Sequence, residues 1–141
     1  MMKLIKSQKG ELSIDVLTGF IIGVVSLLTL ISFISVIMQW QQLNYISKTI
    51  TESIEIEGQV SSDIYSEFNR LKSQIGIDCN MAVSTVYYSG SKIQYRTPFE
   101  VKVTANVDFV ICKPAWAASK MVISIPMNAT YSGKSQVYWK S

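Results

Sequence analysis

The hydrophobic pattern begins with one long apolar stretch near the N-terminus. Residues 16–38 read VLTGFIIGVVSLLTLISFISVIM and contain neither a charged residue nor a proline. A helix of that length extends about 35 Å at ~1.5 Å per residue, enough to cross a hydrocarbon core of ~30 Å. Since backbone polar groups must be paired inside a bilayer, a transmembrane helix is predicted. The remaining chain is too short to bury this helix, and the stretch is longer than the apolar core of a cleaved secretory signal.

Two amphipathic helices are predicted after the apolar stretch, because apolar residues recur every three or four positions. They are Leu43, Ile46, Ile50, Ile54, Ile64, Phe68, Leu71 and Ile75. Glu57 and Gly58 predict a break between the helices. Ser61 or Ser62 is the expected N-cap of the second helix, which is expected to end at Gly76.

Beyond Gly76, β-branched and aromatic residues alternate with polar ones, which predicts strands. The predicted strands are residues 82–88, 92–96, 99–111, 121–131 and 136–139. Without helices between them, they are expected to form an antiparallel sheet. The expected architecture is an α+β membrane protein: a basic leader (1–10), a transmembrane helix (11–38), a helical stem outside the membrane (39–76) and a small antiparallel β head (77–141).

The charges predict an orientation. Lys3, Lys6 and Lys9 precede the apolar stretch, whereas only Lys48 follows it closely. The positive-inside rule places the N-terminus in the cytoplasm and everything after Gln39 outside a single-pass cell-membrane protein. The remaining ten basic residues are balanced by ten acidic ones, so the net charge of +3 comes from the leader. A neutral body argues against nucleic-acid binding.

The composition disfavours an enzyme. The chain has 141 residues, only 16% of them charged, and no histidine. Without histidine, His-based triads and most zinc sites are excluded. We therefore expect no catalytic residues, no metal, no cofactor and no small-molecule substrate.

Gly19 and Gly23 form a GxxxG pattern within the apolar stretch. Small residues let helices approach closely in lipid, which makes this pair a candidate packing face. Gly is also common in transmembrane helices for no such reason, so both interpretations remain open.

The junction before the apolar stretch resembles the class III signal peptide of type IV pilins and TadE-like proteins. The sequence KGELSIDV places Gly10 before Glu11, with Asp15 at the edge of the apolar stretch. The resemblance implies that a prepilin peptidase cuts between Gly10 and Glu11. The new α-amine of one subunit would then neutralise Asp15 of its neighbour during assembly. Pilins usually carry an apolar first residue and a Glu at the fifth position. The alternative is a basic anchor flank followed by an acidic residue that favours the helix N-terminus.

Cys79 and Cys112 are predicted to lie outside the membrane, where disulfides persist. A bridge between them would stabilise the head by roughly 3–4 kcal/mol. Two buried free thiols are the alternative. Two thiolates without a histidine make a poor metal site.

The C-terminal sequence SGKSQVYWK (132–140), together with KGELSIDV and the layout between them, resembles the DUF4320 family. The resemblance implies a short TadE-like membrane protein of Gram-positive bacteria, often associated with conjugative elements. The expected function is a pilin-like structural subunit of a cell-surface or conjugative-transfer apparatus. Its partners would be the lipid bilayer, copies of itself or other pilin-like subunits, and the prepilin peptidase. The alternative is an uncleaved single-pass anchor that docks in a secretion or conjugation channel.

Overall fold

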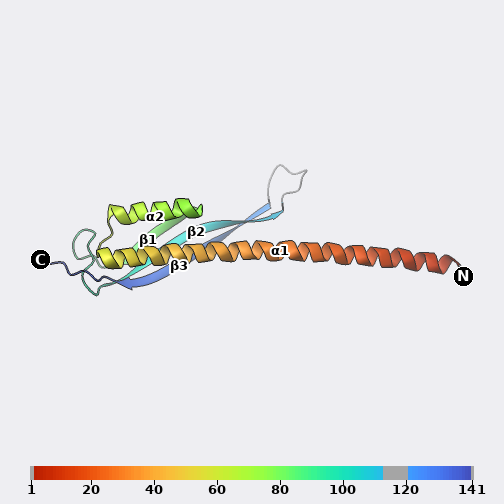
Figure 1. The fold of residues 1–141 in the computed structure, drawn as a ribbon, viewed down its shortest axis with the longest axis horizontal. Coiled ribbons are helices and arrows are strands. Elements are labelled where there is room, and N and C mark those ends of the chain that lie inside the picture. Colours follow the sequence, from red (N-terminus) through yellow and green to blue (C-terminus); the bar gives the residue numbers. More distant parts are fainter. Residues whose placement is uncertain (1, 113–120, 141) are drawn as a thin grey trace. The chain divides into compact units, whose positions relative to one another are not determined.

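The computed structural model describes residues 2–112 and 121–140, with the backbone alone for residues 2–13, 109–112 and 121. The elements are, in chain order, α1 (Met2–Glu57), α2 (Ser62–Ile75), β1 (Cys79–Thr85), β2 (Pro98–Cys112) and β3 (Met121–Lys134) (Figure 1). The chain divides into two units, Met1–Ser35 and Val36–Ser141, and α1 continues from the first into the second.

The first unit contains α1 up to Ser35, including most of the apolar stretch. From residue 16 onward its large apolar side chains are exposed, for example Phe20 at 69% and Leu30 at 62%. In the described part of the chain, this is the one helix long and apolar enough to cross a membrane. The predicted membrane-spanning helix is therefore confirmed as a candidate by length and composition.

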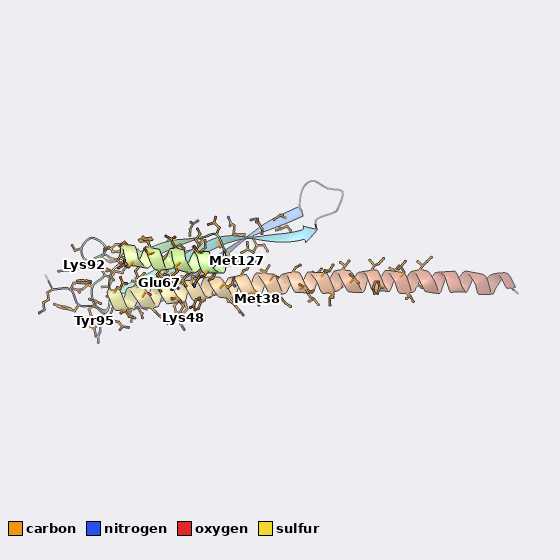
Figure 2. The ribbon with its side chains drawn as sticks, turned by 45° about the horizontal axis from the view of Figure 1, so that its top comes forward. Met38, Lys48, Glu67, Lys92, Tyr95 and Met127 are labelled. Carbon is orange, nitrogen blue, oxygen red and sulfur yellow. The ribbon has the colours of Figure 1, made fainter. Side chains whose placement is uncertain are left out.

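The second unit packs two helices on one face of a three-stranded sheet. The sheet is antiparallel with the order β1-β2-β3, which confirms the predicted α+β class. Its core joins fully buried α1 residues to apolar residues of α2 and of all three strands: Leu43, Ile46, Ile50, Ile54, Ile64, Phe68, Leu71, Cys79, Val101, Val103 and Ala129. Ser53 of α1 donates a hydrogen bond of 3.0 Å to the Glu67 carboxylate of α2. Figure 2 labels Glu67 on α2 and Lys48 on α1.

The break between the helices lies where the sequence predicts it. Gly58 has φ of 65°, a left-handed conformation that glycine adopts without a Cβ penalty. Ser61 is the N-cap of α2, and its hydroxyl accepts a hydrogen bond from the Ile64 amide. Gly76 ends α2 in the left-handed conformation, with its N–H bonded to the Lys72 carbonyl. The N-cap at Ser61 and the end of α2 at Gly76 thus follow from the side-chain hydroxyl of serine and the missing Cβ of glycine.

Two of the five predicted strands are wrong. In residues 92–96 only Lys92 forms isolated bridges and residues 95–96 form a turn, and residues 136–139 have no regular structure. Their backbone groups bond elsewhere: the Ile93 amide donates to the Gly58 carbonyl, and the Gln136 amide donates to the Glu55 carbonyl. In these two segments the alternating residues therefore do not form strands of the sheet. Both segments bond instead to the chain at the end of α1.

The predicted disulfide is also wrong. Cys79 is a buried free thiol. In the sheet it lies opposite Ala105, seven residues before Cys112 on β2. At ~3.3 Å per residue this places the two cysteines roughly 20 Å apart along the strand, far beyond the ~7 Å Cα limit for a bridge. The alternative of a buried thiol is confirmed for Cys79, whereas the Cys112 side chain lies outside the described ones.

β2 and β3 extend beyond the end of β1. β1 pairs with β2 only from Thr85, opposite Phe99, to Cys79, opposite Ala105. Residues 106–112 of β2 therefore pair with residues 121–126 of β3 alone. We call this ribbon the two-stranded arm (Figure 1).

Candidate functional site

The predicted processing and assembly residues lie on one continuous helix. Gly10, Glu11 and Asp15 all have helical backbones within α1. Asp15 is exposed, and among the described residues it has no ion-pair partner. A carboxylate at this edge of a hydrocarbon layer is costly without a partner.

Gly19 and Gly23 follow Asp15 at intervals of four, so the three residues share one face of α1. A Cβ added to either glycine would have nothing within 4 Å apart from the helix itself. The structure thus brings Asp15 and the GxxxG pair onto one open helix surface. This surface can accept another helix at close range.

Several hydroxyl side chains in the apolar stretch of α1 form hydrogen bonds within the helix. Thr18, Thr29 and Ser32 donate to the carbonyl four residues earlier, at 2.9, 2.8 and 3.0 Å. Such bonds remove free donors from a segment in contact with lipid. These hydroxyls are therefore compatible with membrane insertion.

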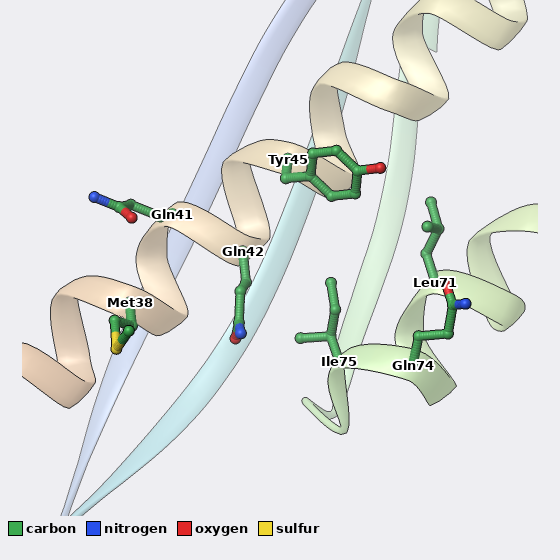
Figure 3. A pocket seen from close by; sticks show the side chains of 7 residues that line it. All are labelled: Met38, Gln41, Gln42, Tyr45, Leu71, Gln74 and Ile75. Carbon is green, nitrogen blue, oxygen red and sulfur yellow. The ribbon is translucent and has the colours of Figure 1, made fainter.

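A shallow groove of about 310 Å³ lies between α1 and α2 in the second unit. Met38, Gln41, Gln42 and Tyr45 line it from α1, and Leu71, Gln74 and Ile75 line it from α2 (Figure 3). The lining is mainly apolar with three amides and carries no carboxylate or amine. It suits apolar contact and not proton transfer.

The turn after α2 holds a charge pair beside the buried thiol. Lys72 and Asp78 form an ion pair of 2.6 Å. Hydrogen bonding to Asp78 raises the pKa of Lys72, and the same bond lowers the pKa of Asp78. Burial raises the pKa of the Cys79 thiol, which leaves it mostly protonated and a poor nucleophile.

The C-terminal segment fastens the end of α1 to the sheet, a role that sequence analysis missed. Glu55 accepts hydrogen bonds from two amides of the segment, Lys134 to its carboxylate and Gln136 to its carbonyl, both at 2.9 Å. The indole N–H of Trp139 donates to the Gly58 carbonyl at 3.1 Å, and the Lys92 ammonium lies 4.4 Å from its ring centroid. Residues of the sequence SGKSQVYWK (132–140) therefore hold the end of α1 against the sheet.

Within the described residues, no group of three or more histidine, cysteine, aspartate or glutamate side chains could hold a metal ion. The apolar part of α1 offers an open packing surface at Gly19 and Gly23 and the exposed carboxylate of Asp15.

Comparison with known families gives one match. The model of DUF4320, a domain of unknown function, matches residues 20–140. The match covers most of the apolar stretch, the stem and the sheet, and it begins after Gly10, Asp15 and Gly19. No curated protein and no solved structure matches the chain.

Proposed function

The chain belongs to the DUF4320 family, whose function is unknown, and we propose that it is a pilin-like structural subunit of a cell-surface or conjugative-transfer apparatus. In this proposal a prepilin peptidase cuts after Gly10, and Asp15 then directs assembly. The partners are the bilayer, copies of the chain or other pilin-like subunits, and the peptidase.

One observation carries the proposal: α1 is a single uninterrupted helix with two different environments. Its first part exposes apolar side chains on every side from residue 16 to residue 38. Its last part packs into the second unit through Leu43, Ile46, Ile50 and Ile54, whose side chains are fully buried. A helix anchored in a folded unit at one end and apolar at the other can pack with identical helices while carrying the folded unit with it.

The charge at Asp15 supports assembly through this helix. Cleavage after Gly10 would create an α-amine at Glu11, one helical turn before Asp15. In an assembly, the amine of one copy can pair with the carboxylate of the next, which offsets the cost of burying both. The open Gly19–Gly23 face would allow the close helix approach that such pairing needs.

A structural function also agrees with the chemistry of the remaining side chains. The chain has no histidine, and the Cys79 thiol is buried with a raised pKa. We therefore propose no catalytic role.

The alternative is an uncleaved single-pass anchor that docks in a secretion or conjugation channel. It shares the proposed orientation, with a cytoplasmic N-terminus and an outer head, because both depend on the lysines before the span. The two functions differ in cleavage and in the role of Asp15.

Three variants separate them. Gly10→Leu should leave an uncut precursor that inserts into the membrane and accumulates. Asp15→Ala should still be cut but fail to enter the assembled structure, since losing one partner of a buried pair costs roughly 3–5 kcal/mol. Asp15→Glu is the matched control, because it keeps the charge and should assemble best.

Gel mobility and the amount of protein in sheared surface fractions measure both effects. If Gly10→Leu and Asp15→Ala match the wild type in size and assembly, the subunit function is wrong and the anchor replaces it.

A further inference from the structure

Trp40 is an exposed aromatic side chain on the part of α1 that belongs to the second unit. Its side chain and backbone are 50% exposed. The other described tryptophan, Trp139, is half-buried and donates its indole N–H to the Gly58 carbonyl at 3.1 Å. Tryptophan is enriched among the side chains that contribute most to protein interfaces. The indole of Trp40 is therefore a candidate contact for another chain.

The groove between α1 and α2 has the lining that an indole needs. Met38 and Tyr45 are 59% and 58% exposed and, with Ile75, supply apolar surface. The side-chain carbonyls of Gln42 and Gln74 can accept a hydrogen bond from an indole N–H (Figure 3). A buried tryptophan usually combines apolar contact with one such acceptor. The lining carries no charged side chain, so an indole would leave no charge buried without a partner.

Trp40 and the groove lie on nearly opposite sides of α1. At ~100° per residue, Met38 and Gln42 are each about 200° around the helix from Trp40. Ser53, whose hydroxyl bonds to Glu67 of α2, is about 220° around from Trp40 by the same ~100° per residue. Trp40 is therefore on the side of α1 that faces away from α2, whereas the groove opens between the two helices.

The two features also lie at the same level of α1. The residues that line the groove from α1 fall between positions 38 and 45, and Trp40 lies within this range. A second copy that is displaced sideways, with its α1 parallel and not rotated, therefore presents Trp40 to the groove of the first. Each copy gives an indole to one neighbour and receives one from another. Such a heterologous contact continues from copy to copy and does not close into a pair.

We propose that the groove between α1 and α2 binds Trp40 of a second copy of this chain. This inference rests on the proposed subunit function, because it needs copies that lie side by side with parallel α1 helices. It adds to that function a specific contact within the second unit. A tryptophan near the end of a membrane span can also contact lipid headgroups, and the test separates the two occupants.

Photocrosslinking of the full chain in native cells tests the contact. The chain carries p-benzoylphenylalanine in place of Trp40, which keeps an aromatic side chain there. Irradiation should give covalent dimers and larger multimers, with the link at residues 71–75 of a second copy. The matched control carries the same group in place of Ile56, which is 71% exposed on the same helix. It should give several-fold fewer links to residues 71–75.

Two variants test the groove and the indole separately. Gln74 is exposed at the groove, so Gln74→Trp should fill the groove from its own copy and lower the crosslinks from position 40 several-fold. Trp40→Ala should be cut after Gly10 like the wild type but reach the sheared surface fraction in several-fold lower amount. Matching circular dichroism spectra and melting temperatures establish that the variants retain the fold.

The outcomes separate this contact from the subunit function. Crosslinks to phospholipid alone, links to a second copy outside the groove, or an unchanged yield in Gln74→Trp would overturn the inference. The subunit function then stands if the wild type is cut after Gly10 and assembles. Crosslinks through the groove in a chain that stays uncut would retain the contact and overturn the subunit function.

Discussion

At the scale of single residues, the close approach of α1 to β3 explains why position 133 is glycine. A Cβ at Gly133 would lie 2.7 Å from both the Glu55 carboxylate and the Thr51 methyl group, and 2.8 Å from the Phe99 ring. The alternation of residues predicts a strand here, but it carries no information on how closely α1 approaches. Only the folded packing reveals why this position is glycine.

Gly133→Ala should therefore destabilise the head. Overpacking of this kind typically costs about 1–3 kcal/mol, which denaturant unfolding of the detergent-solubilised chain will measure. Gly23→Ala is the matched control, because a Cβ there has nothing within 4 Å. Equal unfolding midpoints for the two variants would contradict the close packing around Gly133.

Cys79 should behave as a buried, protonated thiol. In a Cys112→Ser background, maleimide should label it slowly in the folded protein and rapidly after unfolding. Because burial raises its pKa from 9.0, the unfolded state releases the proton first as pH rises. The thiol contribution to stability is thus present below about pH 9 and is lost as the pH rises from there through the folded-state pKa.

Non-reducing mass spectrometry of the wild type should find no peptide linking Cys79 to Cys112, and such a peptide would contradict the register of β1 and β2.

At the scale of elements, the sequence predicts helices better than strands. The break at Gly58, the Ser61 cap and the stop at Gly76 depend on local chemistry that three or four residues determine. The strands expected at 92–96 and 136–139 failed because their backbone partners lie far away in sequence, at Gly58 and Glu55. The same limit applies to the disulfide, since the position of Cys79 opposite Ala105 depends on the register of β1 and β2.

The N-cap of α2 gives a direct test at this scale. The Ser61 hydroxyl accepts from the Ile64 amide at 3.4 Å and donates to Glu57 at 2.8 Å. Ser61→Ala should cost about 1 kcal/mol of unfolding free energy. Ser62→Ala, one residue further and exposed, should cost less than half as much. A larger loss at Ser62 would place the cap one residue later than the structure does.

At the scale of the whole molecule, the predicted site residues lie along one helix, and their roles in processing and assembly stay predictions. Gly10, Asp15 and the glycine pair follow from spacing along one helix, and α1 is continuous through all of them. The two-stranded arm was not predicted, because its position beyond β1 depends on the pairing of strands.

The proposed orientation makes a prediction about access from outside. Protease added to intact, wall-stripped cells should digest residues after Gln39, because the basic leader keeps the N-terminus in the cytoplasm. Digestion of a tag placed at the N-terminus, with the C-terminus protected, would reverse the orientation.

The central claim is that the chain is processed after Gly10 and assembles through α1. Mass spectrometry of the N-terminal peptide, taken from native membrane and sheared surface fractions, tests it most directly. The account predicts a mature N-terminus at Glu11 in the surface fraction. An intact N-terminus at Met1 or Met2 in every fraction would contradict it.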